Sequence, residues 1–567
     1  MSKKWMLLIG VALITSLLAF SEDLFQISKN IDIFSSVYKE LVVNYVDEIN
    51  SSRIIKKGID AMLDDLDPYT EFVPESDIEE YKMKYVSTQY GGIGASVFVR
   101  DGIITISEVY EGFPAQKNDI RAGDELLEVD GVKLSRKKDE DVSAMLKGPK
   151  GTKLKILIKR NNNNTPIEKI FNREEIKQNN VSYSSVLEQE IGYIKLDRFL
   201  ENSAEEVKDA LHQILKSKPK GLILDLRYNG GGILTEAVKI VNLFVAKNIE
   251  IVAQKGRNIE NPIVYKTTKD PIAADIPLVV LINAHSASAS EIVAGSLQDL
   301  DRAVLIGQRS FGKGLVQQTF NLPYNTLVKM TVAKYYLPSG RCIQSLDYSN
   351  KTNNGSANKM ADSLMTEFKT QNKRFVYDGN GIYPDIVIKE KSLNEIIQFL
   401  VSNYLIFDYT NKYRQEHNTI TQPDKFRISD ELYLDFINYT FLKTNQTKSE
   451  KLLNDLKNEI DKNKKSEEFK SEYETLKIKL NNFKKQELTT YKSDIKKLLE
   501  TEIIARYYFE KGRLQYRLKE DIEVNEASKI ILNTTSLTEI LSGANNHKYI
   551  GKPKKYKGEL SAKNDED

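Results

Sequence analysis

The sequence predicts a multidomain α/β protein with helical regions at both ends, and three observations carry this prediction. Buried-strand runs alternate with helical spacing across residues 166–390, which is the pattern of an α/β core. Residues 85–165 contain closely spaced strand patterns separated by glycine turns, which indicates a β-rich domain. Residues 22–84 and 391–540 show helical periodicity, and a chain of 567 residues has room for all of these parts.

The amino terminus has the pattern of an export signal. Met1–Lys4 is a short basic segment and Trp5–Phe20 is apolar, and small residues around Ser21 suit a signal peptidase that cuts before Glu22. Residues 1–21 are therefore predicted to be a signal peptide, and the alternative is a membrane anchor, because 16 apolar residues are near the short end for spanning a bilayer. Both interpretations place the rest of the chain outside the cytoplasm.

Charge and cysteine content exclude several other classes of protein. The formal net charge of +2 argues against nucleic acid as the main partner. The single cysteine, Cys342, excludes an intramolecular disulfide, so export here does not imply a disulfide-stabilised scaffold. No metal-ligand spacing is found, and the sequence predicts neither a metal nor another cofactor.

The β-rich domain at 85–165 resembles a PDZ domain. A glycine-rich stretch, Gly91-Gly92-Ile93-Gly94, precedes the strand from Ala95 to Val99, and the Asp130-Gly131 turn is a hairpin signal. In PDZ domains such a loop offers backbone amides to the terminal carboxylate of a peptide that adds to the sheet edge, so this stretch is the predicted carboxylate site. The alternative is an ordinary tight turn between strands.

The α/β core places glycines after one of its buried strands. Residues 191–196 form a predicted strand, and Ser203 with Glu206 forms a capping box that begins the next helix. The apolar run 221–226 returns as a buried strand and ends in Gly230-Gly231-Gly232. These glycines could form a flexible turn. The alternative is that their unshielded backbone amides face a substrate.

Serines lie at the next junction from strand to helix. Pro277–Ala284 predicts a buried strand and Ala289–Leu300 a helix, so Ser286, Ser288 and Ser290 lie beside helix amides that have no internal partner. A second strand, 303–307, precedes a glycine-flanked turn that contains Lys313. A hydroxyl and an amine are thus offered from adjacent strand ends, although capping serines and a surface lysine would give the same local pattern.

Two rival chemistries use the same residues. Gly307-x4-Gly312-Lys313 nearly matches the phosphate-binding P-loop motif. However, Gly314 stands where that motif has a Ser or Thr, and the residues after it alternate as in a strand and do not open a helix. A Ser-His-Asp triad needs one of four histidines, and none has an obvious route to the serine. These histidines are His212, His285, His417 and His547.

The motifs together resemble the carboxyl-terminal processing proteases, the S41 serine peptidases. The resemblance rests on the run from Ser286 to Glu291, on Phe311-Gly312-Lys313-Gly314 and Gln317-Gln318, and on the DLRxNGGG segment. It implies a crotonase-like S41 protease core at 166–390 with an inserted PDZ domain. It further implies the nucleophile Ser288, the general base Lys313, the lysine-orienting residue Gln317 and the oxyanion-hole amides of Gly232 and Ala289, with Ser286 and Ser290 as structural residues.

The resemblance implies an endopeptidase of the bacterial cell envelope, periplasmic or anchored by its amino terminus. Its PDZ domain would capture the carboxyl-terminal tails of protein substrates, and a Ser-Lys dyad would hydrolyse peptide bonds through an acyl-enzyme. An adaptor or regulator protein, a homo-oligomer formed through the amino-terminal helices, and membrane association are further expectations. The alternative from another class is a non-catalytic PDZ scaffold that binds tails.

The carboxyl-terminal part has no motif that carries chemistry. Residues 391–540 predict a solvated helical bundle, with a dedicated platform for a substrate or partner as the alternative. Residues 541–567 are charged and poor in apolar residues, which predicts a disordered tail.

Overall fold

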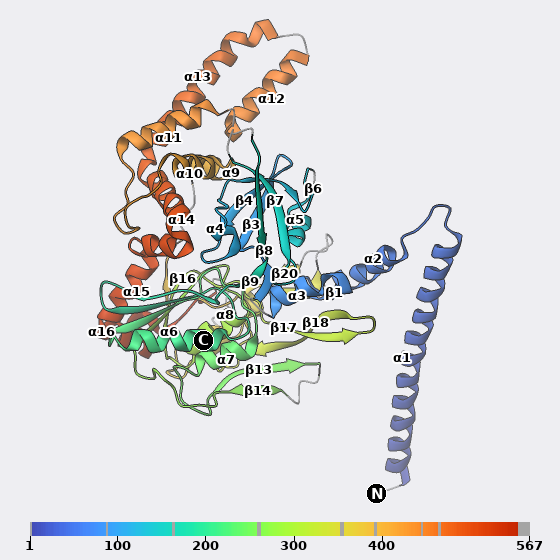
Figure 1. The fold of residues 1–567 in the computed structure, drawn as a ribbon. Coiled ribbons are helices and arrows are strands. Elements are labelled where there is room, and N and C mark those ends of the chain that lie inside the picture. The colour runs from blue at the N-terminus through green and yellow to red at the C-terminus, as the bar shows by residue number, and fades with distance from the viewer. Residues whose placement is uncertain are drawn as a thin grey trace. The chain divides into compact units, whose positions relative to one another are not determined.

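The computed structural model describes most of the chain (Figure 1). The chain divides into two compact units. The described ranges are 3–86, 89–135, 137–160, 165–257, 262–351, 357–389, 394–443, 446–462 and 466–553. The smaller unit comprises Met1–Ile78, Val316–Val332 and Tyr348–Ala357. The larger unit comprises Glu79–Leu315, Ala333–Asp347 and Asn358–Asp567, and therefore contains both Ser288 and Lys313.

Two helices and a small antiparallel pairing form the smaller unit. Asn50 caps the second helix, because its side-chain oxygen accepts the amide of Arg53 at 2.9 Å. The side chains of the predicted signal segment lie outside the described part, and among the described residues no helix is both long and apolar enough to cross a membrane. The elements are α1 (Lys3–Asn44), α2 (Ser51–Asp64) and β1 (Glu71–Val73), which pairs with β18 (Thr326–Tyr336), itself paired with β17 (Leu315–Leu322).

A PDZ-type sheet forms the first part of the larger unit. Its strands lie in the order β3 (Ala95–Arg100), β4 (Ile103–Val109), β5 (Glu125–Val129), β7 (Lys153–Lys159) and β8 (Ile167–Asn172), with β6 (Val132–Lys133) paired to β5. Ala115 of α4 (Pro114–Lys117) and Val142 of α5 (Asp139–Leu146) share its apolar core. The sequence-based boundary at 165 is therefore wrong, because β8 pairs with β7 along its whole length and continues this sheet to Asn172.

A six-stranded sheet forms the protease core, and five of its strands are parallel. Its central strands are buried throughout, as expected when a parallel sheet is covered on both faces. The order is β10 (Val181–Val186), β11 (Ile191–Leu196), β12 (Gly221–Asp225), β15 (Leu278–Ile282), β16 (Val304–Gly307) and β23 (Ile386–Val387). The helices between these strands are α6 (Ser203–Leu215), α7 (Leu234–Val241) and α8 (Ala289–Asp299).

Helices from the carboxyl-terminal region cover one face of this sheet. Val524 and Ile531 of α15 (Ile522–Leu532) and Ile540 of α16 (Thr534–Ser542) share one core with Ile223 and Val279 of the central strands. These two helices fall at the end of the predicted helical region, which therefore shares an apolar core with the protease sheet. The domain boundary at 390 stays a prediction. A disordered tail from 541 is wrong in part, since Ile550 is buried and its amide donates to the Phe375 carbonyl at 2.9 Å; residues 554–567 lie outside the described part.

A helical domain precedes these two helices and has its own apolar core. Leu400, Phe436 and Ile503 are completely buried in it, which agrees with the predicted helical bundle. Its last helix is interrupted at Phe509, which has φ 55° and ψ −159°. The elements are α9 (Glu395–Ser402), α10 (Leu405–Glu416), α11 (Asp430–Leu442), α12 (Lys448–Lys462), α13 (Ser466–Thr490) and α14 (Lys492–Leu518).

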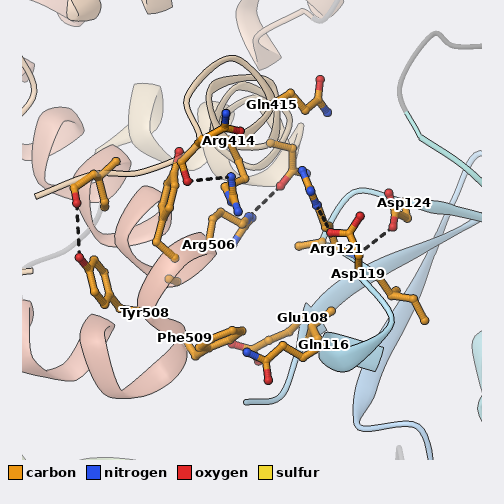
Figure 2. A pocket seen from close by; sticks show the side chains of 18 of the residues that line it. Glu108, Gln116, Asp119, Arg121, Asp124, Arg414, Gln415, Arg506, Tyr508 and Phe509 are labelled. Carbon is orange, nitrogen blue, oxygen red and sulfur yellow. Dashed lines mark hydrogen bonds and ion pairs between the residues drawn. The ribbon is translucent and has the colours of Figure 1, made fainter. Parts of the chain in front are cut away.

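The PDZ domain packs against this helical domain. Phe98 of β3 stacks on Tyr404 with ring centroids 4.8 Å apart, and Arg100 forms an ion pair with Asp408 at 3.0 Å. A cavity of about 480 Å³ lies between the two domains. Figure 2 shows Arg121 on its PDZ side and Arg414 of α10 and Arg506 of α14 on the other. The two domains therefore form a continuous part of the larger unit.

The remaining described elements are short. They are α3 (Ile78–Tyr85), β2 (Gln89–Gly92), β9 (Glu174–Lys177), β13 (Glu250–Gly256), β14 (Ile263–Lys266), β19 (Leu346–Lys351), β20 (Ala357–Lys359), β21 (Glu367–Lys369), β22 (Phe375–Tyr377) and the 3-10 turns η1 (Glu75–Asp77), η2 (Asp362–Leu364) and η3 (Asn545–Lys548). Of these, β2 and β9 pair with each other beside the PDZ sheet.

Candidate active site

Ser288 lies in a strained turn directly before α8. It is half-buried, and its φ of 55° and ψ of −113° fall outside the regions that a residue with a Cβ prefers. Such a conformation costs about 1–3 kcal/mol and persists where the surroundings enforce it, often at functional sites. The junction of strand and helix therefore lies where the sequence predicts it. Ser288 has a non-helical backbone conformation and is the N-cap of α8.

The flanking serines hold a neighbouring loop. The Ser286 hydroxyl donates to the carbonyl of Leu226 and the Ser290 hydroxyl donates to the carbonyl of Asn229, each at 2.8 Å. Both side chains are fully buried. Their hydroxyls are used to fix the segment that follows β12, which agrees with a structural role for these two serines.

Glu291 connects the serine turn to the lysine turn. One carboxylate oxygen accepts the amides of Ser288 at 2.8 Å and Lys313 at 2.9 Å. The other accepts the Ser310 hydroxyl at 2.5 Å and the Gly312 amide at 2.7 Å. Burial raises the pKa of Glu291 to about 7, although these hydrogen bonds favour its charged form. The sequence analysis missed this role, because three of the four donors, Ser310, Gly312 and Lys313, lie 19, 21 and 22 residues later in the chain.

Tyr335 makes a second link between the same two segments. Its hydroxyl lies 2.5 Å from the carbonyl oxygen of Lys313 and 3.2 Å from that of Ser288, and its side chain is almost completely buried. The backbones of the two residues predicted as nucleophile and base are thus held together by one carboxylate and one phenol.

The loop after β12 runs against the serine turn. A Cβ placed on Gly231 would lie 2.6 Å from the Ala287 carbonyl oxygen and 2.8 Å from the Ser288 Cβ, so this approach requires glycine. Within the described ranges, the amides of Gly232 and Ala289 donate to no other group. These are the two amides that the resemblance assigns to an oxyanion hole, and that role stays a prediction.

Gln317 belongs to the smaller unit. It lies on β17, where its side-chain amide donates to the Thr331 hydroxyl at 3.2 Å. Its orienting role toward Lys313 stays a prediction.

The rival chemistries find no support in the geometry. The phosphate-loop interpretation is wrong, because strand β17 and not a helix follows Lys313. The His285 ring is exposed and stacks on Tyr228 with centroids 5.3 Å apart. The other histidines belong to other elements: His212 is exposed on α6, His417 is the C-cap of α10 and His547 lies in η3.

The predicted carboxylate loop of the PDZ domain is shorter than the sequence suggests. Gly91 and Gly92 belong to β2, which pairs with β9, and a Cβ on Gly91 would lie 2.0 Å from the Gly148 carbonyl oxygen. Ile93 is buried, and Gly94 has φ 73° directly before β3. Of the four predicted residues, Ile93 and Gly94 form the connection between strands, and β3 is an edge strand of the PDZ sheet.

Comparison with known families finds three matches along the chain. The model for peptidase family S41 matches residues 190–348, and a PDZ domain model matches residues 105–160. Residues 396–531 match a model described as the carboxyl-terminal helical domain of a probable PDZ-protease. These three matches correspond to the α/β core, the β-rich domain and the helical region.

Carboxy-terminal-processing and CtpA-like proteases are among the proteins similar to this chain. The chain is 34% identical over 319 residues to the carboxy-terminal-processing protease of Bartonella bacilliformis, which covers 55% of this chain and 72% of that protein. It is 31% identical over 358 residues to a probable CtpA-like serine protease of Staphylococcus aureus, covering 60% of this chain and 71% of that one. Among solved structures, the photosystem II D1 C-terminal processing protease matches with 26% identity and a TM-score of 0.34, covering 57% of this chain and 85% of that chain. The chain belongs to peptidase family S41 and is a carboxy-terminal-processing serine protease with a PDZ domain.

Proposed function

We propose that this protease is exported, captures the carboxyl-terminal tails of its substrates with the PDZ domain, and cuts them with a Ser288-Lys313 dyad. The observation that carries the dyad is the carboxylate of Glu291, which accepts the backbone amides of both residues on one oxygen. This shared acceptor keeps the two turns together, as a nucleophile and its base require.

The reaction proceeds in two halves. The Ser288 hydroxyl attacks the scissile carbonyl while the neutral Lys313 amine takes its proton, and the amides of Gly232 and Ala289 donate to the oxygen that becomes negative. Collapse of the tetrahedral intermediate breaks the peptide bond, and the lysine returns the proton to the leaving amine. A water molecule then attacks the acyl-enzyme, again giving its proton to Lys313, and Ser288 is restored.

Tail capture rests on β3 of the PDZ domain. An edge strand offers unpaired backbone groups, so a peptide can add to it as a further strand. The turn at Ile93 and Gly94, at the start of this strand, is where a terminal carboxylate would lie. The amino-terminal segment supports a place in the bacterial cell envelope, with membrane association if that segment is retained.

Cleavage by matched variants tests this proposal. The substrate is an unfolded protein with an apolar carboxyl-terminal tail, and fragments are identified by mass spectrometry after incubation with wild type, Ser288→Ala, Lys313→Ala or His285→Ala. We expect loss of cleavage in the first two variants and retention in the third, with all variants folded. Binding of the tail by wild type without any cleavage would instead favour the scaffold alternative.

A further inference from the structure

Arg227 is a buried cation at the start of the loop that carries Gly232. Its side chain is 11% exposed, and its Nη2 lies 2.6 Å from a carboxylate oxygen of Asp225, which is 1% exposed. Lys195 lies 3.6 Å from the same aspartate and 3.6 Å from Asp197, whose side chain is 41% exposed. Although burial opposes ionisation, the charges of Arg227 and Lys195 hold the pKa of Asp225 below its usual value. One buried carboxylate therefore serves two cations.

The other end of the Arg227 guanidinium is held by the carboxyl-terminal region. Its Nη1 lies 2.9 Å from Asp521 and also contacts Glu523, and both carboxylates are less than one fifth exposed. Asp521 is the N-cap of α15 and accepts the amides of Glu523 and Val524, each at 3.0 Å. Glu523 also accepts the side-chain amide of Gln308 at 2.6 Å. Helix α15 thus begins with two carboxylates that contact this arginine.

The Arg227 segment is connected directly to the serine turn. The next residue, Tyr228, donates its amide to the Asn283 side chain at 3.0 Å. Asn229 then accepts the amide of Ala287 at 3.0 Å and the hydroxyl of Ser290 at 2.8 Å. A displacement of Arg227 would therefore move the loop that carries Gly232 and Gly231, of which Gly231 packs against Ser288.

From these contacts we propose that Asp521 and Glu523 are positioning residues of the active site, and that α15 holds the oxyanion loop in place through Arg227. The inference rests on the proposed dyad and oxyanion hole. It assigns the carboxyl-terminal helical region a part in catalysis, because the end of that region supplies two of the three carboxylates around the arginine. A cavity of about 480 Å³ borders Arg227 and both carboxylates, so a released guanidinium has room to turn away from the loop.

Two substitutions remove the charge and keep the local structure. Asp521→Asn retains an N-cap, because asparagine caps a helix about as well as aspartate. Glu523→Gln retains an oxygen that can accept from Gln308. The matched control is Glu526→Gln on the same helix, since Glu526 forms an ion pair with Lys529 at 3.1 Å whose lysine is 73% exposed.

The experiment measures kcat and KM for a tailed substrate, together with the melting temperature and the tail affinity of each variant. We expect kcat to fall about tenfold for each single variant and further for the double variant, with KM and tail affinity within twofold of wild type. The control variant keeps the wild-type kcat. A merely structural role would lower the melting temperature and leave the kcat of the folded fraction unchanged.

Several results would overturn the inference. The inference fails if kcat is unchanged in both single variants. It also fails if kcat falls equally in Glu526→Gln, or if only KM rises in the single variants. If the double variant does not fold, the single variants carry the same test. A wild-type chain and control that never cleave would refute the proposed function instead, so the two failures are distinguishable.

Discussion

The substitution Glu291→Gln separates the stability of the active-site turns from their activity. Glu291 is fully buried, and its two oxygens accept four hydrogen bonds. Glutamine has one oxygen, and the amide nitrogen in place of the other would face two of these donors. We expect the serine and lysine turns to separate and kcat/KM at pH 8 to fall by about 10² or more, comparable to the loss of an oxyanion donor.

Relative to wild type, the Glu291→Gln variant is expected to gain stability as the pH rises, although it loses activity. The pKa of Glu291 is raised from 4.5 to about 7 by burial, so between these values the folded chain keeps a proton that the unfolded chain has released. The stability contribution is complete below pH 4.5 and is lost as the pH rises through 7. A difference of about 2.5 pH units corresponds to about 3 kcal/mol in the free energy of unfolding. Because glutamine resembles the protonated acid, the variant escapes this loss.

Urea unfolding of wild type and variant at pH 4.5, 6 and 8 provides the assay. Subtracting the two free energies cancels the other titrating groups, and we expect the variant to gain up to about 3 kcal/mol relative to wild type between pH 4.5 and 8. A constant difference across this range would refute the raised pKa. Full activity of the variant at pH 8 would refute the organising role of the carboxylate.

Three other substitutions have defined outcomes. Gly231→Ala places a Cβ against the serine turn at a residue with φ 96°, so we expect cleavage to fall at least 100-fold. The control Gly230→Ala, whose Cβ would have no heavy atom within 4 Å, should keep cleavage within about threefold of wild type in the same assay. Tyr335→Phe removes the hydroxyl between Ser288 and Lys313, and kcat should fall about tenfold with a loss of about 1 kcal/mol in urea unfolding; an unchanged kcat would show that the phenol does not position the dyad. Arg374→Met leaves the buried side chains of Asp301 and Asp385 without their countercharge. We expect the free energy of unfolding to fall by about 3–5 kcal/mol, measured as a lower melting temperature, and a fall below about 1 kcal/mol would contradict a stabilising role of these ion pairs.

The sequence predicted best those features that depend on local pattern. The apolar run at 221–226, the junction before α8 and the strand after Lys313 are all found where the residue pattern places them. The role of Glu291 was missed because a pattern identifies a capping residue but not the donors that a distant turn brings to it. The same limit explains why β8 was assigned to the protease core and why the packing of α15 on the protease sheet was not predicted, since periodicity identifies an apolar face but not the surface that it covers.

Covalent labelling of the nucleophile tests the central claim most directly. The wild-type chain is treated with a fluorophosphonate, digested and analysed by mass spectrometry, with Lys313→Ala and Ser286→Ala treated in parallel. The account predicts one adduct, on Ser288, which is absent or at least 100-fold slower to form in Lys313→Ala and still forms in Ser286→Ala. An adduct on another residue, or equal labelling of Ser288 without the lysine, would contradict the dyad.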